Sequence, residues 1–141
     1  MFNVIVVGAD DSPTARRAIE TAAELAVMSE GTLHIVSAYD VKTPSDSNLP
    51  AEFRHLDTDG EVVALLQMLS FVAKNKGAEP VLHSVKGDPV DAIISTADKL
   101  NADLIVVGNK GMRGARRVLG SVPNSVAHGA NCSVAIIDTT L

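Results

Sequence analysis

Five short runs rich in Val, Ile and Leu alternate with four segments of helical periodicity along this chain. Alternation of this kind is typical of a parallel sheet that is covered by helices. The first and fourth runs are almost unbroken Val, Ile and Leu, as expected for central strands buried on both faces. We therefore predict an α/β fold, a five-stranded parallel sheet with helices on both faces and strand order 3-2-1-4-5. The expected strands are Asn3–Val7, Thr32–Tyr39, Pro80–Val85, Asp103–Val107 and Ser133–Ile137.

Two of the expected helices begin with a capping residue followed by proline. Ser12 followed by Pro13 is interpreted as an N-cap and a first helical residue, and Asp88 followed by Pro89 as a second such pair. A short last helix is expected to begin between Ser121 and Pro123 and to end near Ala130. A chain of 141 residues is long enough to bury one core, so we predict a single domain over residues 1–141.

Composition narrows the classes of partner. The chain carries 12 Lys and Arg against 17 Asp and Glu, and only 3% of its residues are aromatic. Nucleic-acid binding usually calls for a basic surface or aromatic stacking platforms, so it is not expected here. The apolar runs are too short to span a membrane, no basic leader precedes the first strand, and the single cysteine fits a reducing compartment. We expect a cytoplasmic protein whose partners include neither nucleic acid nor membrane.

Two of the expected strands end in the same three residues, Val-Val-Gly. Val6-Val7-Gly8 continues into Ala9-Asp10, and Val106-Val107-Gly108 continues into Asn109-Lys110. In a doubly wound sheet, ligands lie beyond the carboxyl ends of the strands where the winding reverses, and the first and fourth strands are neighbours there. We therefore expect the two loops to face each other across a crevice.

The second loop combines glycine with positive charge. Lys110, Arg113, Arg116 and Arg117 fall within eight residues of an otherwise acidic chain. Glycines let successive N–H groups converge on one anion and adopt positive φ, and Gly120-Ser121 precedes a helix start that favours phosphate. The alternative is that the glycines are turn residues and the basic side chains a solvated surface. We interpret the loop as phosphate-binding, with Ser121 as a hydroxyl donor and Lys110 or Arg113 as the charge.

These motifs resemble those of the universal stress proteins. That family carries Gly-x2-Gly-x9-Gly-[Ser/Thr] after the fourth strand and an aspartate after the first. Gly108-x2-Gly111, Gly120-Ser121 and Asp10 match, and Gly87-Asp88-Pro89 is similar to the family's Gly-Asp-Pro at the third strand–helix junction. The resemblance covers essentially the whole chain. It implies a Rossmann-like, adenine nucleotide alpha hydrolase-like fold that binds ATP or a related nucleotide.

The resemblance also implies which residues surround the nucleotide. Adenine would lie beside Ala9, Asp10 and Ala38, ribose near Asp10 and Gly108, and the phosphates against the second loop and the last helix. A divalent ion such as Mg²⁺ would be carried by the phosphates, since the chain has no dedicated ligand cluster for one. The expected nucleotide-binding residues are Gly8, Ala9, Asp10, Ala38, Val107, Gly108, Asn109, Lys110, Gly111, Arg113, Gly120, Ser121 and Val122.

Three departures from the family pattern bear on the choice of nucleotide. Eight residues separate Gly111 from Gly120, where the pattern has nine. The shorter loop favours AMP or cyclic AMP over ATP. In addition, Asp11 replaces a common glycine, and Pro123 stands where some relatives offer a hydroxyl and an N–H.

Candidate catalytic residues are few. Asp10 and Asp11 are adjacent, and adjacent side chains on an extended segment point in opposite directions, so they are not expected to share a proton. The four histidines occur in separate elements without zinc-site spacing, and Cys132 precedes a buried strand as a packed thiol would. We therefore expect no catalytic or metal-binding residue, and no enzyme activity beyond weak ATP hydrolysis. The histidines are His34, His55, His83 and His128.

The last expected strand, Ser133–Ile137, is apolar on both faces and lies at a sheet edge, where it invites pairing with another chain. The resemblance likewise implies a homodimer through this strand, whereas the alternative is an edge masked by Asp138–Leu141. We interpret the protein as a stress-linked sensor or regulator that binds an adenine nucleotide. The alternatives are a universal-stress-like dimeric scaffold that has lost the nucleotide, and a weak ATPase or nucleotidyl transferase.

Overall fold

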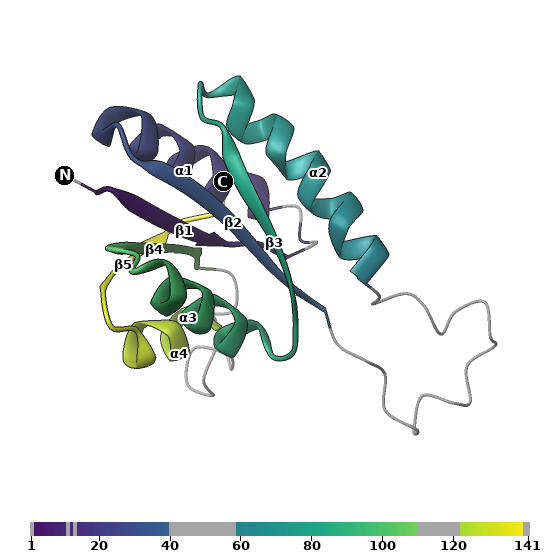
Figure 1. Cartoon of the computed structure of the whole chain (residues 1–141), viewed down its shortest axis with the longest axis vertical. Coiled ribbons are helices and arrows are strands. Elements are labelled where there is room, and N and C mark those ends of the chain that lie inside the picture. The colour runs from purple at the N-terminus through teal and green to yellow at the C-terminus, as the bar shows by residue number, and fades with distance from the viewer. Residues whose placement is uncertain (1, 11, 13, 40–58, 110–121, 140–141) are drawn as a thin grey trace.

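The computed structural model describes residues 2–10, 12, 14–39, 59–109 and 122–139 (Figure 1). Within these residues, five parallel strands form a sheet in the order β3-β2-β1-β4-β5, which confirms the predicted fold class and strand order. Each strand lies within a residue of its predicted bounds. The strands are β1 (Val4–Gly8), β2 (Thr32–Tyr39), β3 (Pro80–Lys86), β4 (Leu104–Gly108) and β5 (Ser133–Ile137).

Helices cover both faces of the sheet. Two of them pack against one face and two against the other, as Figure 1 shows. The first pair is α1 (Ala15–Ser29) and α2 (Asp59–Asn75), and the second pair is α3 (Pro89–Leu100) and α4 (Val122–Gly129). None of the helices in the described ranges is long and apolar enough to cross a membrane.

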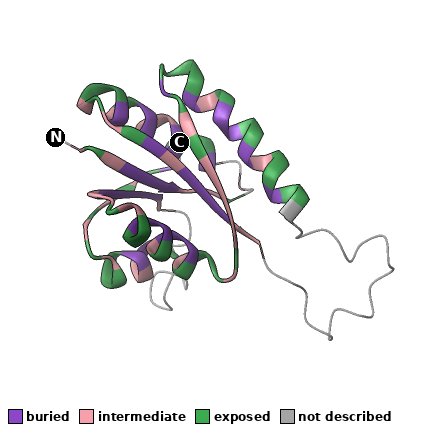
Figure 2. Ribbon diagram, viewed as in Figure 1, coloured by how far each residue is buried: buried purple, intermediate pink, exposed green. Residues whose placement is uncertain are grey.

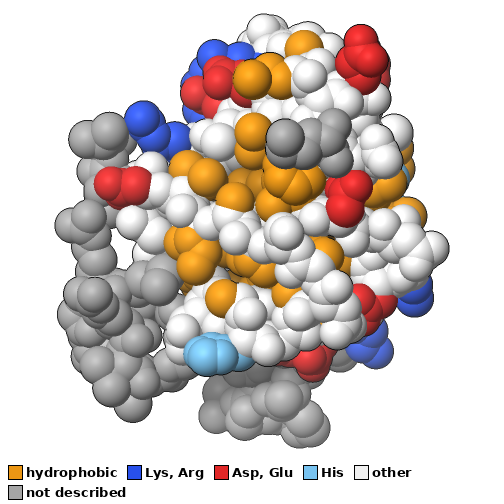
Figure 3. All heavy atoms as spheres, turned by 90° about the vertical axis from the view of Figure 1, so that its left-hand side faces the viewer, with side chains coloured by type: hydrophobic (Ala, Val, Ile, Leu, Met, Phe, Trp, Pro, Cys, Tyr) orange, Lys and Arg blue, Asp and Glu red, His pale blue; other side chains and the backbone are white. Residues whose placement is uncertain are grey.

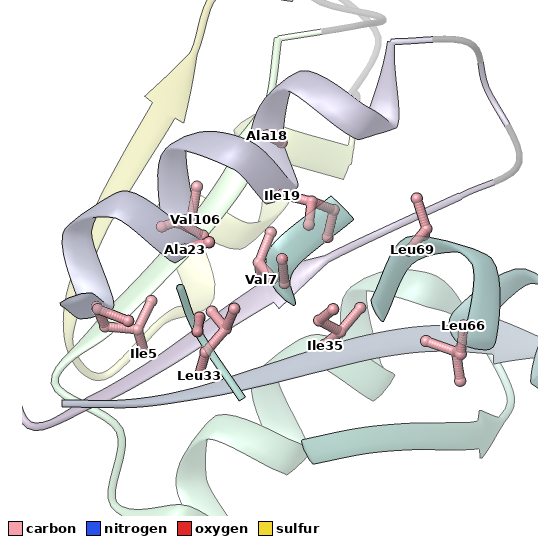
Figure 4. Close-up of a cluster of buried hydrophobic side chains, with 14 of the residues drawn as sticks. Ile5, Val7, Ala18, Ile19, Ala23, Leu33, Ile35, Leu66, Leu69 and Val106 are labelled. Carbon is pink, nitrogen blue, oxygen red and sulfur yellow. The ribbon is translucent and has the colours of Figure 1, made fainter. Parts of the chain in front are cut away.

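The core is centred on β1 and β4. Ile5, Val6 and Val7 are fully buried, as expected for a strand covered on both faces (Figure 2). Alternate side chains of the central strands enter two separate apolar clusters, because successive residues of a strand point to opposite faces. The cluster toward α1 and α2, shown in Figure 4, is closed by the small residues of α1, including Ala18 and Ala23, which let that helix approach the sheet closely.

Of the two predicted helix starts in Ser-Pro and Asp-Pro sequences, one is confirmed and one is wrong. The carboxylate of Asp88 accepts a hydrogen bond from the Asp91 N–H at 3.2 Å and caps α3, with Pro89 as its first residue. The N-cap of α1 is Thr14 rather than Ser12. The N–H of Ser12 donates to the Asp10 carboxylate at 2.8 Å, so a local turn precedes the helix and delays its start.

Strand register brings the two central loops together. β1 and β4 are paired directly, with Ile5 opposite Leu104 and Val7 opposite Val106, so both strands end at the same edge of the sheet. After β1 the chain enters α1 on one face, whereas the helices on either side of β4 lie on the other face (Figure 1). The reversal of winding therefore falls between β1 and β4, where such folds open a crevice.

Candidate functional site

A cavity of about 200 Å³ lies in this crevice, beyond the carboxyl ends of β1 and β4. Its lining comes from both central strands, from the first turns of α1, α3 and α4, and from the segment after β5. Elements of both helical layers thus meet around one space. The lining residues are Gly8, Ala9, Asp10, Ser12, Thr14, Ala15, Ala18, Pro89, Ile93, Val107, Gly108, Val122, Pro123 and Thr139.

The loop after β1 is held to the neighbouring strand. The N–H of Ala9 donates to the Val36 carbonyl at 2.9 Å, and the Ser37 hydroxyl donates to the Ala9 carbonyl at 2.9 Å. The Ala9 N–H thus continues the β1–β2 pairing by one residue, and the Ala9 carbonyl is held by a side chain. The next side chain, that of Asp10, is exposed at the cavity and accepts the Ser12 N–H. The loop is thereby fixed from both sides.

The two strand-ending glycines make room for side chains of other elements. A Cβ at Gly8 would collide with Cδ1 of Ile93, and a Cβ at Gly108 would lie 2.8 Å from Cγ2 of Thr139. Neither glycine has a positive φ; among the described glycines, positive φ occurs at Gly77 and Gly87. Among the glycines of the second loop, Gly111, Gly114 and Gly120 lie outside the described residues, and Gly108 does not supply positive φ. Its role is close packing, which shapes the cavity walls.

The opposite wall is built by the first turns of α3 and α4. Gly87, with a φ of 126°, turns the chain from β3 into α3, where the Asp88 cap orients Pro89 and Ile93 toward the cavity. Val122 and Pro123 begin α4; Val122 is 37% exposed at the cavity, whereas Pro123 is buried.

The structure brings together six of the thirteen residues expected to bind nucleotide: Gly8, Ala9, Asp10, Val107, Gly108 and Val122. Ala38 does not line the cavity; it packs against the apolar cluster on the side of α3 and α4. Asn109 adjoins the lining but directs its side-chain amide to the segment after β5. Lys110, Gly111, Arg113, Gly120 and Ser121 lie outside the described residues.

Sequence reasoning missed eight lining residues. Most of them had a usable signal, because they occupy the first turns of helices that follow the predicted crevice strands, or the Gly87-Asp88-Pro89 junction. Thr139 had none, since it follows the edge strand β5 rather than a strand of the crevice. The missed residues are Ser12, Thr14, Ala15, Ala18, Pro89, Ile93, Pro123 and Thr139.

The chemistry of the lining suits a ligand with an apolar part and hydroxyl groups. Alanine, valine, isoleucine and proline supply most of the walls, and Ser12, Thr14 and Thr139 supply hydroxyls. Among the described lining residues, Asp10 is the one ionisable side chain. A carboxylate at the edge of an apolar cavity can accept hydrogen bonds from ligand hydroxyls.

Two histidines from different strands are in contact outside this site. Nδ1 of His34 on β2 lies 2.9 Å from Nε2 of His83 on β3, and burial lowers the pKa of both rings. His128 is exposed on α4, and His55 lies outside the described residues. Among the described side chains, no three His, Cys, Asp or Glu gather as a metal site would require.

Cys132 is the packed thiol that the sequence predicts. It is half-buried against the cluster on the side of α3 and α4. Burial raises the pKa of its thiol, and the nearby carboxylates of Asp103 and Asp98 raise it further. A raised pKa disfavours the thiolate, the form needed for nucleophilic chemistry.

Comparison with known proteins places the sequence among relatives of one kind. Residues 1–138 match the Universal stress protein family. A universal stress protein of Mycobacterium tuberculosis is 36% identical over 145 residues, covering 99% of this chain and 98% of the relative. The universal stress protein A homolog 1 of Coxiella burnetii is 31% identical over 137 residues, covering 94% of each chain.

Solved structures of universal stress proteins superpose on this chain. A universal stress protein in complex with cAMP superposes with a TM-score of 0.83 at 34% identity, covering 99% of each chain. A universal stress protein from Archaeoglobus fulgidus in complex with dAMP superposes with a TM-score of 0.71 at 26% identity, covering 96% of this chain and 98% of that one.

Proposed function

Because this chain belongs to the universal stress protein family, we propose that it binds an adenine nucleotide in the crevice beyond β1 and β4. The observation that carries the proposal is the cavity at the reversal of winding, lined by both Val-Val-Gly strand ends and Asp10. Such crevices are the usual ligand sites of open parallel sheets. The complexes of two structural relatives with cAMP and dAMP support the same class of ligand.

Within this class, the proposed ligand is a nucleoside monophosphate or cyclic AMP rather than ATP. Eight residues separate Gly111 from Gly120, one fewer than the family's triphosphate pattern. The two structural relatives in complex with cAMP and dAMP each carry a ligand with one phosphate. Bound ATP would bring Mg²⁺ on its own phosphates, since Asp10 is the one carboxylate among the described lining residues.

The proposed pose follows from the chemistry of the walls. The base would occupy the apolar part of the cavity, and the Asp10 carboxylate would accept hydrogen bonds from ribose hydroxyls. The phosphate would lie toward the start of α4 near Val122, where the helix dipole favours an anion. Lys110, Arg113 and Ser121 are the proposed sources of charge and a hydroxyl beside it.

We propose that the protein binds its nucleotide without turning it over. The described lining residues include no histidine, lysine or cysteine, so Asp10 is the candidate base among them. Its Oδ1 already accepts the Ser12 N–H. The protein would then act as a sensor or regulator, as a cytoplasmic homodimer joined through β5. The edge position and apolar composition of β5 support this dimer. The free thiol of Cys132 fits the reducing compartment that a cytoplasmic protein occupies.

Calorimetric titration with cyclic AMP, AMP and ATP tests the proposal, using a variant that blocks the cavity mouth. Val122→Trp should weaken cyclic AMP binding on the order of tenfold or more, about 1.4 kcal/mol, by filling the site. Val63→Trp is the matched control, because Val63 is also 37% exposed on a helix but does not line the cavity. Equal affinity of both variants would place the ligand elsewhere.

A wild-type protein that binds none of the three nucleotides would favour the scaffold that has lost its ligand. Release of inorganic phosphate from ATP, abolished by Asp10→Ala, would favour the weak ATPase. Each of these results contradicts a different part of the proposal.

A further inference from the structure

The segment after β5 forms one wall of the cavity. Thr139 lines the cavity and is only 2% exposed. Its methyl carbon would lie 2.8 Å from a Cβ at Gly108, so the side chain rests on the backbone at the end of β4. A polar residue this deeply buried needs hydrogen-bond partners to hold it there.

Asn109 supplies those partners. Its Oδ1 accepts the backbone N–H of Thr139 at 3.0 Å and the Thr139 hydroxyl at 3.1 Å, which uses both lone pairs of that oxygen. Its Nδ2 donates to Oδ1 of Asp138 at 3.1 Å. The Asn109 backbone N–H donates to the Ile137 carbonyl at 2.8 Å. One residue thus ties three consecutive residues of the last segment to the end of β4.

We propose that Asn109 is a positioning residue, which holds Asp138 and Thr139 as a strap and thereby sets the wall of the nucleotide site. This inference rests on the proposed function above. It differs from the expectation that Asn109 contacts the nucleotide, because the amide oxygen is taken up by Thr139. Asn109 therefore holds both the end of β5, through Ile137, and the cavity wall, through Thr139, which packs on Gly108. Loosening the strap would change the shape of the site although Asn109 does not touch the ligand.

Exchanging donor and acceptor between Asn109 and Asp138 tests the strap. Asn109→Asp removes the donor and sets two carboxylates against each other, so cyclic AMP affinity should fall roughly tenfold. Asp138→Asn keeps an acceptor for Nδ2 and should lose less affinity than Asn109→Asp does. The double variant Asn109→Asp/Asp138→Asn recreates the bond with its polarity reversed and should recover most of the affinity.

A double-mutant cycle separates positioning from direct contact. If Asn109 acts through Thr139, the losses of affinity in Asn109→Ala and Thr139→Ala should be far from additive, because both variants break the same linkage. Amide hydrogen exchange at Thr139 supplies a readout that needs no ligand. Its N–H should be protected in the wild type and unprotected in Asn109→Ala, which removes the Oδ1 acceptor.

The outcomes are distinct. Unchanged cyclic AMP affinity in Asn109→Asp, no recovery in the double exchange, or additive losses in the cycle would each overturn the inference while leaving the proposed function intact. A wild-type protein that binds no nucleotide would instead overturn the proposed function, and with it the role of the strap in binding.

Discussion

Gly8 and Gly108 end the two central strands, and each is contacted by one side chain from another element. Ile93 of α3 lies over Gly8, and Thr139 lies over Gly108. Both side chains also line the cavity. The glycines were found from the sequence by their repeated Val-Val-Gly context, but these contacts were not, because Ile93 and Thr139 are distant in sequence from their partners. Residue identity thus predicted that the two glycines lie at the crevice, whereas the contacts that form the cavity walls required the fold.

Replacing Gly8 with alanine tests this packing. The added methyl group would collide with Cδ1 of Ile93, so Gly8→Ala should lower the free energy of unfolding by about 1–3 kcal/mol. Ile93→Val removes Cδ1 and should cost about 0.5–1.5 kcal/mol alone. The double variant should be more stable than the sum of the two losses predicts, as measured by urea denaturation. Simple additivity would show that Ile93 is not what excludes a side chain at position 8.

At the scale of elements, strand and helix positions followed closely from periodicity and capping residues, because buried parallel strands and Asp-Pro caps leave strong local patterns. The start of α1 did not, since the Asp10 carboxylate competes locally for the Ser12 N–H. The contact between His34 and His83 was also out of reach. The two residues are 49 apart in sequence and meet only because β2 and β3 pair, with Val36 opposite His83.

This histidine pair predicts a pH dependence of stability. Burial lowers the pKa of both rings from 6.5, and for His34 the facing His83 lowers it further, so the folded state binds protons less readily than the unfolded chain. The unfolded state then takes up more protons as the pH falls below about 6.5, and stability declines through that window. Above it the contribution of the pair is fully present.

Thermal unfolding at pH 7.5 and pH 5.5 measures this effect. Between pH 7.5 and pH 5.5, the melting temperature of His83→Asn should fall by less than that of the wild type. The melting temperature of His128→Asn, at an exposed position on α4, should fall as far as that of the wild type. If the melting temperature of His83→Asn falls as far as that of the wild type, the histidine pair does not cause the loss of stability at acid pH.

On the scale of the whole molecule, the fold class was predictable because alternating strands and helices indicate a parallel sheet covered on both faces. The strand order 3-2-1-4-5 was predicted as a common order of such folds, and the structure has it. The distribution of hydrophobic and charged side chains over the surface was harder to predict from the sequence. On the face shown in Figure 3, described hydrophobic side chains gather in the middle, and Lys and Arg side chains lie toward the rim. The two sheet edges, β3 and β5, present Val81 and Ile136 at 48% and 38% exposure.

The proposed homodimer uses the β5 edge. Ile136→Lys places a charge there and should shift the wild-type dimer toward monomer in sedimentation equilibrium, by roughly tenfold or more in dissociation constant. Val81→Lys at the opposite edge is the matched control and should leave the dimer unchanged. A monomeric wild type, or a dimer lost only in Val81→Lys, would contradict assembly through β5.

The proposed function requires an adenine nucleotide in the crevice between the ends of β1 and β4. Amide chemical shifts recorded during titration with cyclic AMP test it most directly, because they report the location of the ligand residue by residue. We predict saturable shifts concentrated at Gly8–Asp10, Val107–Asn109, Val122 and Thr139, with little change at the His34–His83 pair. Shifts confined to other surfaces, or none at millimolar cyclic AMP, would contradict binding in the crevice.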